Sequence, residues 1–226
     1  MAYKILLNTL DNRQARKVSR ELATEGHEVY ALIRAGETGK DTDAVFLAST
    51  DVTDQEQIKT AIAQMGDGFD ILILSIPEWG GEADALRGKT IWDGIDESVL
   101  LDILSYNVNN VLQTVRAAIP FLRKGALKRI VLLTDPTASI RETDEETDYA
   151  YHMSQAAAGM IMKILFNTYR PEGFTFRCYA DDGRRAGISA CEYLLTEQSY
   201  IETDDYIHSD ENRLVMRDGL LREISW

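Results

Sequence analysis

The stretch from Lys4 to Arg34, KILLNTLDNRQARKVSRELATEGHEVYALIR, decides the fold. Its flanking segments YKILLN (3–8) and HEVYALIR (27–34) are short apolar runs, which favour buried strands. Between them ARKVSRELATEG (15–26) has the apolar spacing of an amphipathic helix, with Gly26 as its stop. A strand, a helix and a second strand in this order predict two parallel neighbours in one sheet.

The same alternation continues along the chain. Further strands are expected at AVFLAST (44–50), FDILILSI (69–76), RIVLLT (129–134) and FTFRCYA (174–180), and helices at 51–66, 96–124, 149–169 and 184–198. The helix 51–66 has capping-box spacing at Thr53 and Glu56, and 212–224 is typical of a hairpin turning at Asp218-Gly219. This pattern predicts an α/β fold: a three-layer, doubly wound parallel sheet in which residues 1–226 form a single domain.

Composition narrows the class of protein. The net charge of −13 does not favour nucleic acid or an anionic membrane surface as a partner. Two cysteines, Cys178 and Cys191, are too few for a disulfide framework, which favours a reducing cytoplasm. The first residues turn polar too quickly for a signal peptide, and no apolar run reaches transmembrane length. The three histidines show no metal-binding spacing, so we expect no metal site.

Ligands of such sheets bind beyond the carboxyl ends of the strands, where the strand order reverses. The loops in question are NTLDNRQA (8–15), PEWGGEAD (77–84) and DPTASIRETDEETD (135–148). The first loop holds no glycine, although a dinucleotide-binding turn normally needs glycines so that the pyrophosphate can approach the backbone. The acidic run in the third loop, residues 141–148, is typical of a solvated face and would repel a nucleotide phosphate nearby.

Laid along its whole length, the chain resembles the short-chain dehydrogenase/reductase (SDR) family. Asn8, Thr9, Arg13 and Ala15 stand where that family has the fixed residues of T-G-x-x-x-G-x-G. The family's other cofactor-contacting positions correspond here to Asp51 and Val52 of DVTD and to Ser75 of LSIP. The resemblance therefore implies a Rossmann fold.

The catalytic positions of the family are partly altered. NVNNVLQTVRAAIP (107–120) places Asn107 on the catalytic asparagine, and YHMSQAA (151–157) places Tyr151 on the catalytic tyrosine. Asp135 stands in place of the serine, with Thr134 beside it, and Gln155 replaces the lysine. A neutral Gln155 cannot favour the phenolate of Tyr151, and a carboxylate at Asp135 would disfavour it. Tyr151 and Asn107 could equally be structural residues.

Three residues bear on whether the chain binds a nucleotide, and of which kind. Arg13 stands where the pyrophosphate would pass, and Asp11 can cap the N-terminus of the helix, so either could fill the phosphate site from within. Alternatively, Arg13 grips a phosphate as an ion pair. After the second strand, Arg34 follows Ile33 in the family's acidic position, which implies NADP(H) rather than NAD if a nucleotide binds; otherwise Arg34 is a solvated surface residue.

Length also differs from the family. After the sixth strand the family usually inserts a pair of helices over the substrate, whereas RCYADDGRRAGISACEYLL (177–195) passes almost directly into the last helix. The resemblance therefore implies a shortened substrate lid.

Three functional hypotheses follow. The first is an SDR-fold protein that has lost hydride transfer and acts as a non-catalytic subunit or small-ligand scaffold, since Thr9, Arg13, Pro77, Asp135 and Gln155 all depart from the motif. The alternative is an atypical NADP(H)-dependent oxidoreductase using Tyr151. The second alternative is a cofactor-free acid–base enzyme using Asp135 and Tyr151.

Oligomerisation is a separate expectation. The helix AAAGMIMKILFNTY (156–169) is apolar around much of its circumference, which indicates burial on two sides. In the SDR family this helix and the one carrying Asn107 form a four-helix interface. The resemblance therefore implies a homodimer or homotetramer, or a heteromer with an active SDR subunit.

Overall fold

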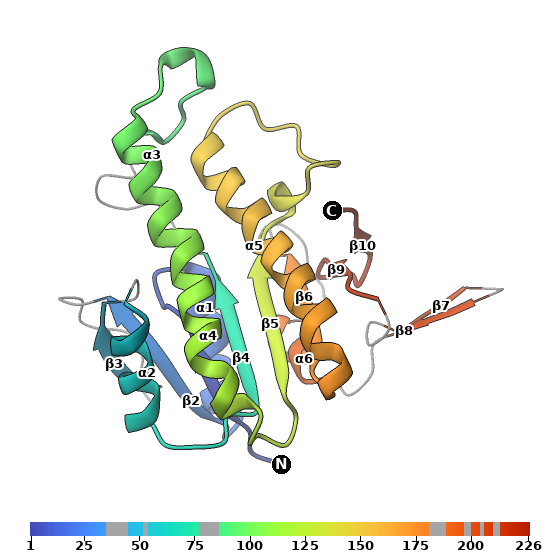
Figure 1. The fold of residues 1–226 in the computed structure, drawn as a ribbon. Helices are drawn as coiled ribbons and strands as arrows, with labels where there is room; N and C mark the ends of the chain where they lie inside the picture. The colour runs from blue at the N-terminus through green and yellow to red at the C-terminus, as the bar shows by residue number, and fades with distance from the viewer. Residues whose placement is uncertain are drawn as a thin grey trace.

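The computed structural model describes residues 1–34, 45–51, 54–76, 86–180, 189–196, 200–203, 206–209 and 213–226. Its centre is an eight-stranded sheet in the order β10-β9-β6-β5-β4-β1-β2-β3 (Figure 1). Neighbouring strands are parallel, except for the antiparallel pair β9–β10. The strands are β1 Lys4–Leu7, β2 Glu28–Arg34, β3 Val45–Thr50, β4 Ile71–Ser75, β5 Arg129–Thr134, β6 Thr175–Ala180, β9 Met216–Arg217 and β10 Glu223–Ile224.

Helices cover both faces of this sheet. On one face α1 (Arg13–Thr24) and α6 (Ala190–Leu195) share a core with the strands. On the other face lie α2 (Gln55–Gln64), α4 (Asn110–Leu122) and α5 (Tyr149–Tyr169). The predicted three-layer, doubly wound α/β architecture is thereby confirmed.

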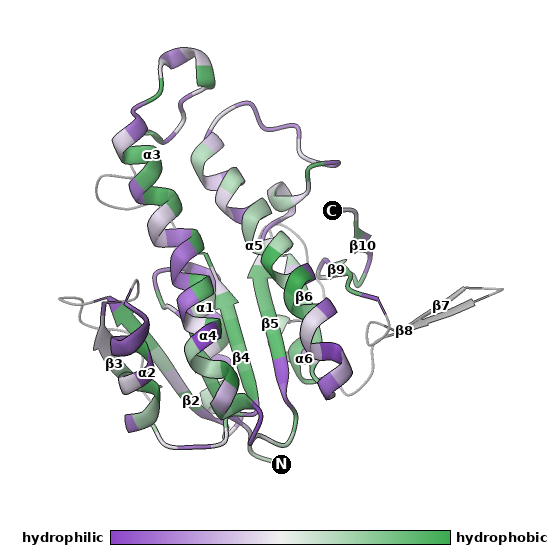
Figure 2. Cartoon of the chain, in the orientation of Figure 1, coloured by the Kyte–Doolittle hydropathy of each residue, from purple (hydrophilic) through white to green (hydrophobic). Residues whose placement is uncertain are grey.

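The sequence of the central strands explains why both faces are covered. Along β1, Leu6 packs into the core on the α4 side, whereas Ile5 and Leu7 pack into the core on the α1 side. Side chains alternate between the faces of a strand, so a continuous apolar run requires a cover on each side. Figure 2 shows the result: β4 and β5 are largely apolar, whereas α4 mixes polar and apolar positions.

The helix expected at 96–124 is continuous but irregular. It consists of α3 (Glu97–Leu104), a π-helical turn η3 (Ser105–Asn109) and α4, and Pro120 lies inside α4 close to its end. The irregularity is centred on Asn107, consistent with the structural role considered for that residue. Single π turns inside α-helices often accompany functional sites.

Several local predictions need correction. The N-cap of α2 is Asp54, whose carboxylate accepts the backbone N–H groups of Glu56 and Gln57; Thr53 lies outside the described residues. A second small sheet, β7 (Tyr200–Thr203) with β8 (Tyr206–Ser209), was not predicted. α6 begins at Ala190, later than expected, and 181–188 lie outside the described residues, so the shortened lid stays a prediction.

The C-terminal hairpin is confirmed, because β9 and β10 pair around a turn at Asp218. Short helical turns complete the described structure: η2 (Ile91–Asp93), η4 (Pro136–Ala138) and η5 (Arg170–Glu172). Within the described ranges, no helix combines the length and the apolar character needed to cross a bilayer.

Candidate functional site

The carboxyl ends of β1 and β4 meet at the point where the strand order reverses. There the side chain of Asn8 pairs with the backbone of Ser75: Oδ1 accepts from its N–H at 2.8 Å, and Nδ2 donates to its C=O at 3.0 Å. Asn12 Nδ2 donates to the carbonyl of Ile76 at 2.8 Å. These bonds tie the β1–α1 loop to the end of β4 through the chain's own side chains.

The N-terminus of α1 is capped from within. Asn12 Oδ1 accepts the backbone N–H groups of Gln14 at 2.8 Å and Ala15 at 3.1 Å. The prediction that Asp11 caps the helix is therefore wrong. A side chain of the same loop does cap it, but that residue is Asn12. The helix begins at Arg13, which makes Asn12 the residue in the extended N-cap conformation, and Arg13 itself is exposed.

Asp11 has a different role. Its carboxylate accepts a hydrogen bond from the hydroxyl of Tyr106 at 2.8 Å, and the guanidinium of Arg34 lies over the Tyr106 ring, 5.0 Å from its centroid. Asp11 belongs to the loop that enters α1 on one face of the sheet, whereas Tyr106 packs into the core on the opposite face. Arg34 is the last residue of β2. We call this group of Asp11, Tyr106 and Arg34 the clasp.

The turn between β1 and α1 contains no glycine and needs no left-handed backbone conformation. Thr9 Oγ1 accepts the backbone N–H of Asp11 at 3.0 Å. Among the described non-glycine residues only Lys128, Asp148 and Leu221 have a positive φ, so Thr9 needs no left-handed conformation. The backbone of this turn can therefore hold a threonine at position 9, whereas a turn with a positive φ at that position would favour glycine.

A dinucleotide bound to a fold of this kind places its pyrophosphate at the N-terminus of the first helix. The N–H groups that would receive its pyrophosphate are bonded to Asn12, and the clasp joins the two helix layers over the carboxyl edge beside β1. Asp51 follows β3 and its N–H donates to Gln57 Oε1 at 3.3 Å. Val52 and Pro77 lie outside the described residues.

The positions that match the family's catalytic residues are paired with one another. Tyr151 donates its hydroxyl to Asp135 Oδ2 at 2.9 Å, and Thr134 donates to Gln155 Oε1 at 2.7 Å. Asp135 Oδ1 is bound as well, by the backbone N–H and the hydroxyl of Thr137. Both carboxylate oxygens of Asp135 therefore have donors.

Asn107 completes this group from the π-helical turn. Its Nδ2 donates to Ser154 Oγ at 3.2 Å, and the Ser154 hydroxyl donates to the carbonyl of Ala150. Asn107, Ser154 and Gln155 are all buried. The structure thus brings Thr134, Asp135, Tyr151 and Gln155 together as predicted, with Asn107 on the same side of α5, in a network of side-chain hydrogen bonds.

Sequence reasoning missed Asn12, Tyr106 and Ser154. Asn12 carried a usable signal, because asparagine directly before a helix start is a preferred N-cap. Tyr106 carried none, since its partner Asp11 is 95 positions away in the sequence.

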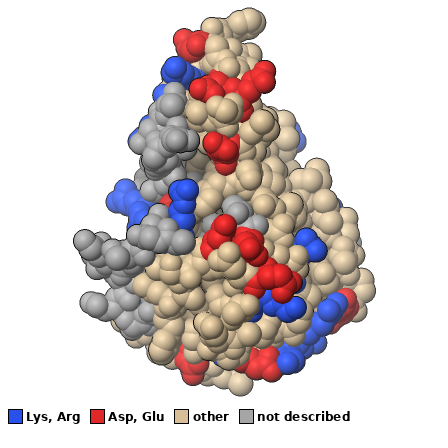
Figure 3. Space-filling model, turned by 60° about the vertical axis from the view of Figure 1, so that its left-hand side comes forward, with Lys and Arg blue, Asp and Glu red and all other residues tan. Residues whose placement is uncertain are grey.

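The surface charge is acidic but dispersed. Figure 3 shows acidic side chains at the tip of the molecule formed by η2 and α3, and mixed charges lower on the same face. The carboxylates of Asp93 and Asp96 at this tip have lowered pKa values, since the N–H of Thr90 binds Asp93 and the hydroxyl of Ser98 binds Asp96. This face offers no continuous basic surface for a polyanion.

Comparison with known proteins gives partial relatives in sequence. No family model matches the chain. The C-signal protein of Myxococcus xanthus is 32% identical over 80 residues, covering 35% of this chain and 48% of that protein. The short-chain dehydrogenase/reductase AacuF of Aspergillus aculeatus is 30% identical over 120 residues, covering 50% and 45%. The alignments thus span about half the length of these curated relatives.

Solved structures match over the whole chain. A protein described as a short-chain alcohol dehydrogenase from Burkholderia multivorans has a TM-score of 0.72 at 19% identity, with both chains fully covered. A proposed carbonyl reductase, Sniffer of Caenorhabditis elegans, gives 0.74 at 14% identity, again with full coverage. At these identities the likeness establishes the fold, which is the Rossmann-like fold of short-chain dehydrogenase/reductase structures.

Proposed function

We propose that this chain is a degenerate member of the SDR family that does not transfer hydride and acts as a non-catalytic binding subunit. Family membership is supported by the full-length likeness in fold and by the partial match to AacuF. It is also supported by the order of elements and by Asn107 and Tyr151 at the expected positions.

The observation that carries the proposal is the clasp. The Tyr106–Asp11 hydrogen bond of 2.8 Å joins the two helix layers where a pyrophosphate would lie. Asn12 occupies the helix N–H groups that would otherwise bind the phosphate oxygens. A bound nucleotide would have to break the Tyr106–Asp11 contact and displace the Asn12 cap.

The catalytic positions support the same conclusion. Gln155 brings no charge, and its Oε1 is already bonded to Thr134. The hydroxyl of Tyr151 is directed at a carboxylate rather than at an open cleft. In a cofactor-free acid–base reaction, a substrate would have to compete with the hydrogen bonds that Thr137 and Tyr151 donate to the two oxygens of Asp135.

We also propose that the chain assembles through the outer faces of α3, α4 and the C-terminal half of α5 as a homodimer or homotetramer. Large apolar side chains are exposed there: Leu101 (65%), Leu112 (42%), Met160 (62%) and Ile164 (56%). Such a surface is typical of an interaction site. Sedimentation equilibrium tests this; a monomer at all concentrations would point instead to a heteromer with an active SDR subunit.

The two cysteines indicate the redox state of the compartment in which the protein works. Cys178 and Cys191 are both buried and unbridged. Free thiols are usual in a reducing compartment, so we propose a cytoplasmic protein.

The decisive experiment is calorimetric titration of the full chain with NADPH, NADP, NADH and NAD. We expect no binding of any of the four at millimolar concentration, and no oxidation of NADPH with carbonyl substrates. Micromolar binding of NADPH that is lost in Arg34→Ala would contradict the proposal and establish the NADP(H)-dependent alternative. Arg116→Ala, which removes an exposed arginine of α4 ten residues beyond Tyr106, is the matched control.

A further inference from the structure

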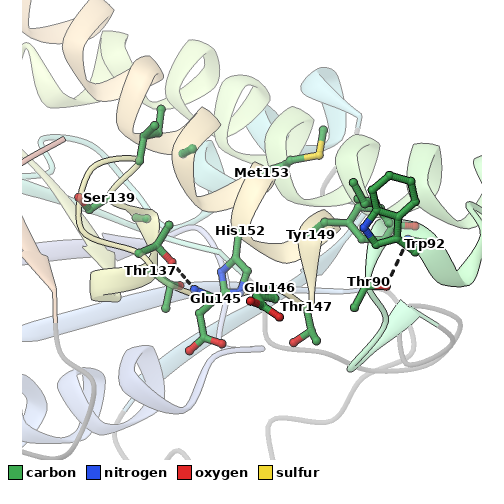
Figure 4. Close-up of a pocket in the computed structure, with 15 residues that line it drawn as sticks. Thr90, Trp92, Thr137, Ser139, Glu145, Glu146, Thr147, Tyr149, His152 and Met153 are labelled. Carbon is green, nitrogen blue, oxygen red and sulfur yellow. Dashed lines mark hydrogen bonds between the residues drawn. The ribbon is translucent and has the colours of Figure 1, made fainter.

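A second concave region lies outside the sites discussed above. It is a cavity of about 680 Å³ between η2, the segment that follows η4 and the start of α5. Figure 4 shows Trp92 and Tyr149 toward one end of it, His152 with Glu145 and Glu146 in the middle, and Thr137 and Ser139 toward the other end. This volume is within the range of small-molecule sites.

The cavity uses the face of α5 that points away from the catalytic positions. Tyr149, His152, Met153 and Ala156 line it, with the spacing of a single helical face. At 3.6 residues per turn, Tyr151 and Gln155 lie roughly opposite that face. Neither Tyr151 nor Asp135 lines the cavity, which nevertheless adjoins them, because its lining residue Thr137 donates a hydrogen bond to Asp135.

The walls of the cavity are fixed by hydrogen bonds. Asp148 Oδ1 accepts the N–H of Gly88 at 2.5 Å, and the N–H of Asp148 donates to the carbonyl of Lys89 at 3.0 Å. These bonds hold the segment before η2 against the first turn of α5. A capping box between Thr90 and Asp93 then fixes η2, which carries Trp92. The cavity therefore has a defined shape before any ligand binds.

The surfaces of the cavity are apolar and aromatic. Trp92 is 89% exposed, Ile140 81%, Ile91 55% and Met153 48%, although these are residue types that folding normally buries. All four line the cavity. An apolar group placed among them would be removed from water on several sides.

The charged side chains of the cavity are anionic. Glu145 and Glu146 contribute two carboxylates, and the residues that line the cavity include no lysine and no arginine. Tyr149 Oη and His152 Nδ1 are buried and have no hydrogen-bond partner among the described residues. Both atoms are shielded within the wall of the cavity, so the groups that can meet the charge of a ligand are the two exposed carboxylates.

We propose that this cavity binds a small organic amine, in which a primary ammonium is attached to an aryl or alkyl body. The ammonium supplies three donors and a positive charge, which match the two carboxylates. Its apolar body matches Trp92, Ile140 and Met153, and the indole ring also attracts a cation over its face. The net charge of −13 attracts cations to the whole molecule.

This assignment does not depend on the closed nucleotide groove. Because the cavity lies on the other face of α5, amine binding and nucleotide binding are separate measurements. An active reductase could bind the amine, and an inactive scaffold could fail to bind it. The two proposals therefore fail independently.

The test is calorimetric titration of the full chain with 2-phenylethylamine and with its neutral isostere 2-phenylethanol. We expect the amine to bind about tenfold more tightly than the alcohol, from cation–π and charge contacts together. Glu145→Gln with Glu146→Gln removes two exposed charges from the cavity and is expected to abolish that preference while keeping the affinity for the alcohol. Asp102→Asn removes an exposed charge outside the cavity and is expected to keep the preference.

Tryptophan fluorescence locates the binding. The amine should change the emission of the wild type, and this change should be lost in Trp92→Phe. Equal affinity for amine and alcohol, no binding of the amine at 10 mM, or binding that survives the double substitution unchanged would each overturn the proposal. Amine affinity that falls as protein concentration rises would overturn it in favour of a second copy of the chain covering the cavity.

Discussion

The two faces of α5 treat their polar side chains in opposite ways. On the inner face, Tyr151 and Gln155 are bonded to Asp135 and Thr134. On the outer face, Tyr149 Oη and His152 Nδ1 are buried without a partner among the described residues. Both faces belong to one helix of 21 residues, so the difference comes from what packs against each face.

The contrast concerns which polar groups of α5 have hydrogen-bond partners within the chain. The inner face keeps the positions of a catalytic site, but its hydrogen-bonding capacity is used within the protein. The outer face lines a cavity with aromatic and apolar side chains, and its Tyr149 Oη and His152 Nδ1 have no partner among the described residues. This difference is the reason for proposing a ligand at the cavity.

The largest expected effect lies at the N-terminus of α1. Asn12→Ala removes the cap of α1 and the bond to the Ile76 carbonyl, and we expect the free energy of unfolding to fall by about 2 kcal/mol. Asn12→Asp keeps a capping oxygen and should lose about half as much. Urea denaturation measures the free energy of unfolding of both variants. A decrease below about 0.5 kcal/mol for Asn12→Ala would show that Asn12 does not stabilise the start of α1.

The next effect concerns the buried pair on the inner face. Thr134→Val leaves Gln155 Oε1 without its donor at a position that is 1% exposed, so we expect a loss of about 1–2 kcal/mol. Gln155→Leu should cost a similar amount. Because the double variant removes both partners, its loss should be smaller than the sum of the two. Additive losses in this double-mutant cycle would show that the pair is not coupled.

A matched pair of substitutions compares the two faces directly. Tyr151→Phe removes a hydrogen bond to a carboxylate and should destabilise the protein by about 1 kcal/mol. Tyr149→Phe removes a buried hydroxyl that has no partner and should leave stability unchanged or raise it. Thermal unfolding of the two variants tests this difference. Equal losses of stability in both would show that the two tyrosine hydroxyls contribute equally.

The smallest effect is a pH dependence at the wall of the cavity. Hydrogen bonds from Thr90 lower the pKa of the Asp93 carboxyl in the folded protein, so the ionised form stabilises the capping box. Its contribution is present above the unfolded pKa, near 3.9, and is lost as pH falls through the lower folded value. Asp93→Asn should therefore reduce stability slightly at pH 7 and make no difference at the acid end. A difference that is independent of pH would contradict this assignment.

Much of the fold could be predicted from the sequence. The helix expected at 149–169 has those bounds in the structure, and each of the six predicted parallel strands forms where its apolar run lies. These elements are set by local patterns, since burial on both faces of a sheet demands continuous apolar runs and a helix demands a 3.6-residue period. The small sheet of β7 and β8 escaped prediction because no apolar alternation marks it.

The sites were predicted less completely. A motif alignment assigned four neighbouring positions to one site, and these residues are hydrogen-bonded in two pairs in the structure: Thr134, Asp135, Tyr151 and Gln155. It could not show that Asn12 rather than Asp11 caps α1, since either residue suits a helix start and the first helical residue decides between them.

The sequence alone thus determined the order and type of the elements, because these depend on neighbours within about ten residues. The tertiary structure decided which groups meet: the clasp joins Asp11 to Tyr106 across 95 positions, and the cavity combines η2 with α5. Such contacts arise only when the sheet order brings distant loops to the same edge. Whether a polar group there finds a partner depends on distances of about 3 Å, which a pattern of residue types does not encode.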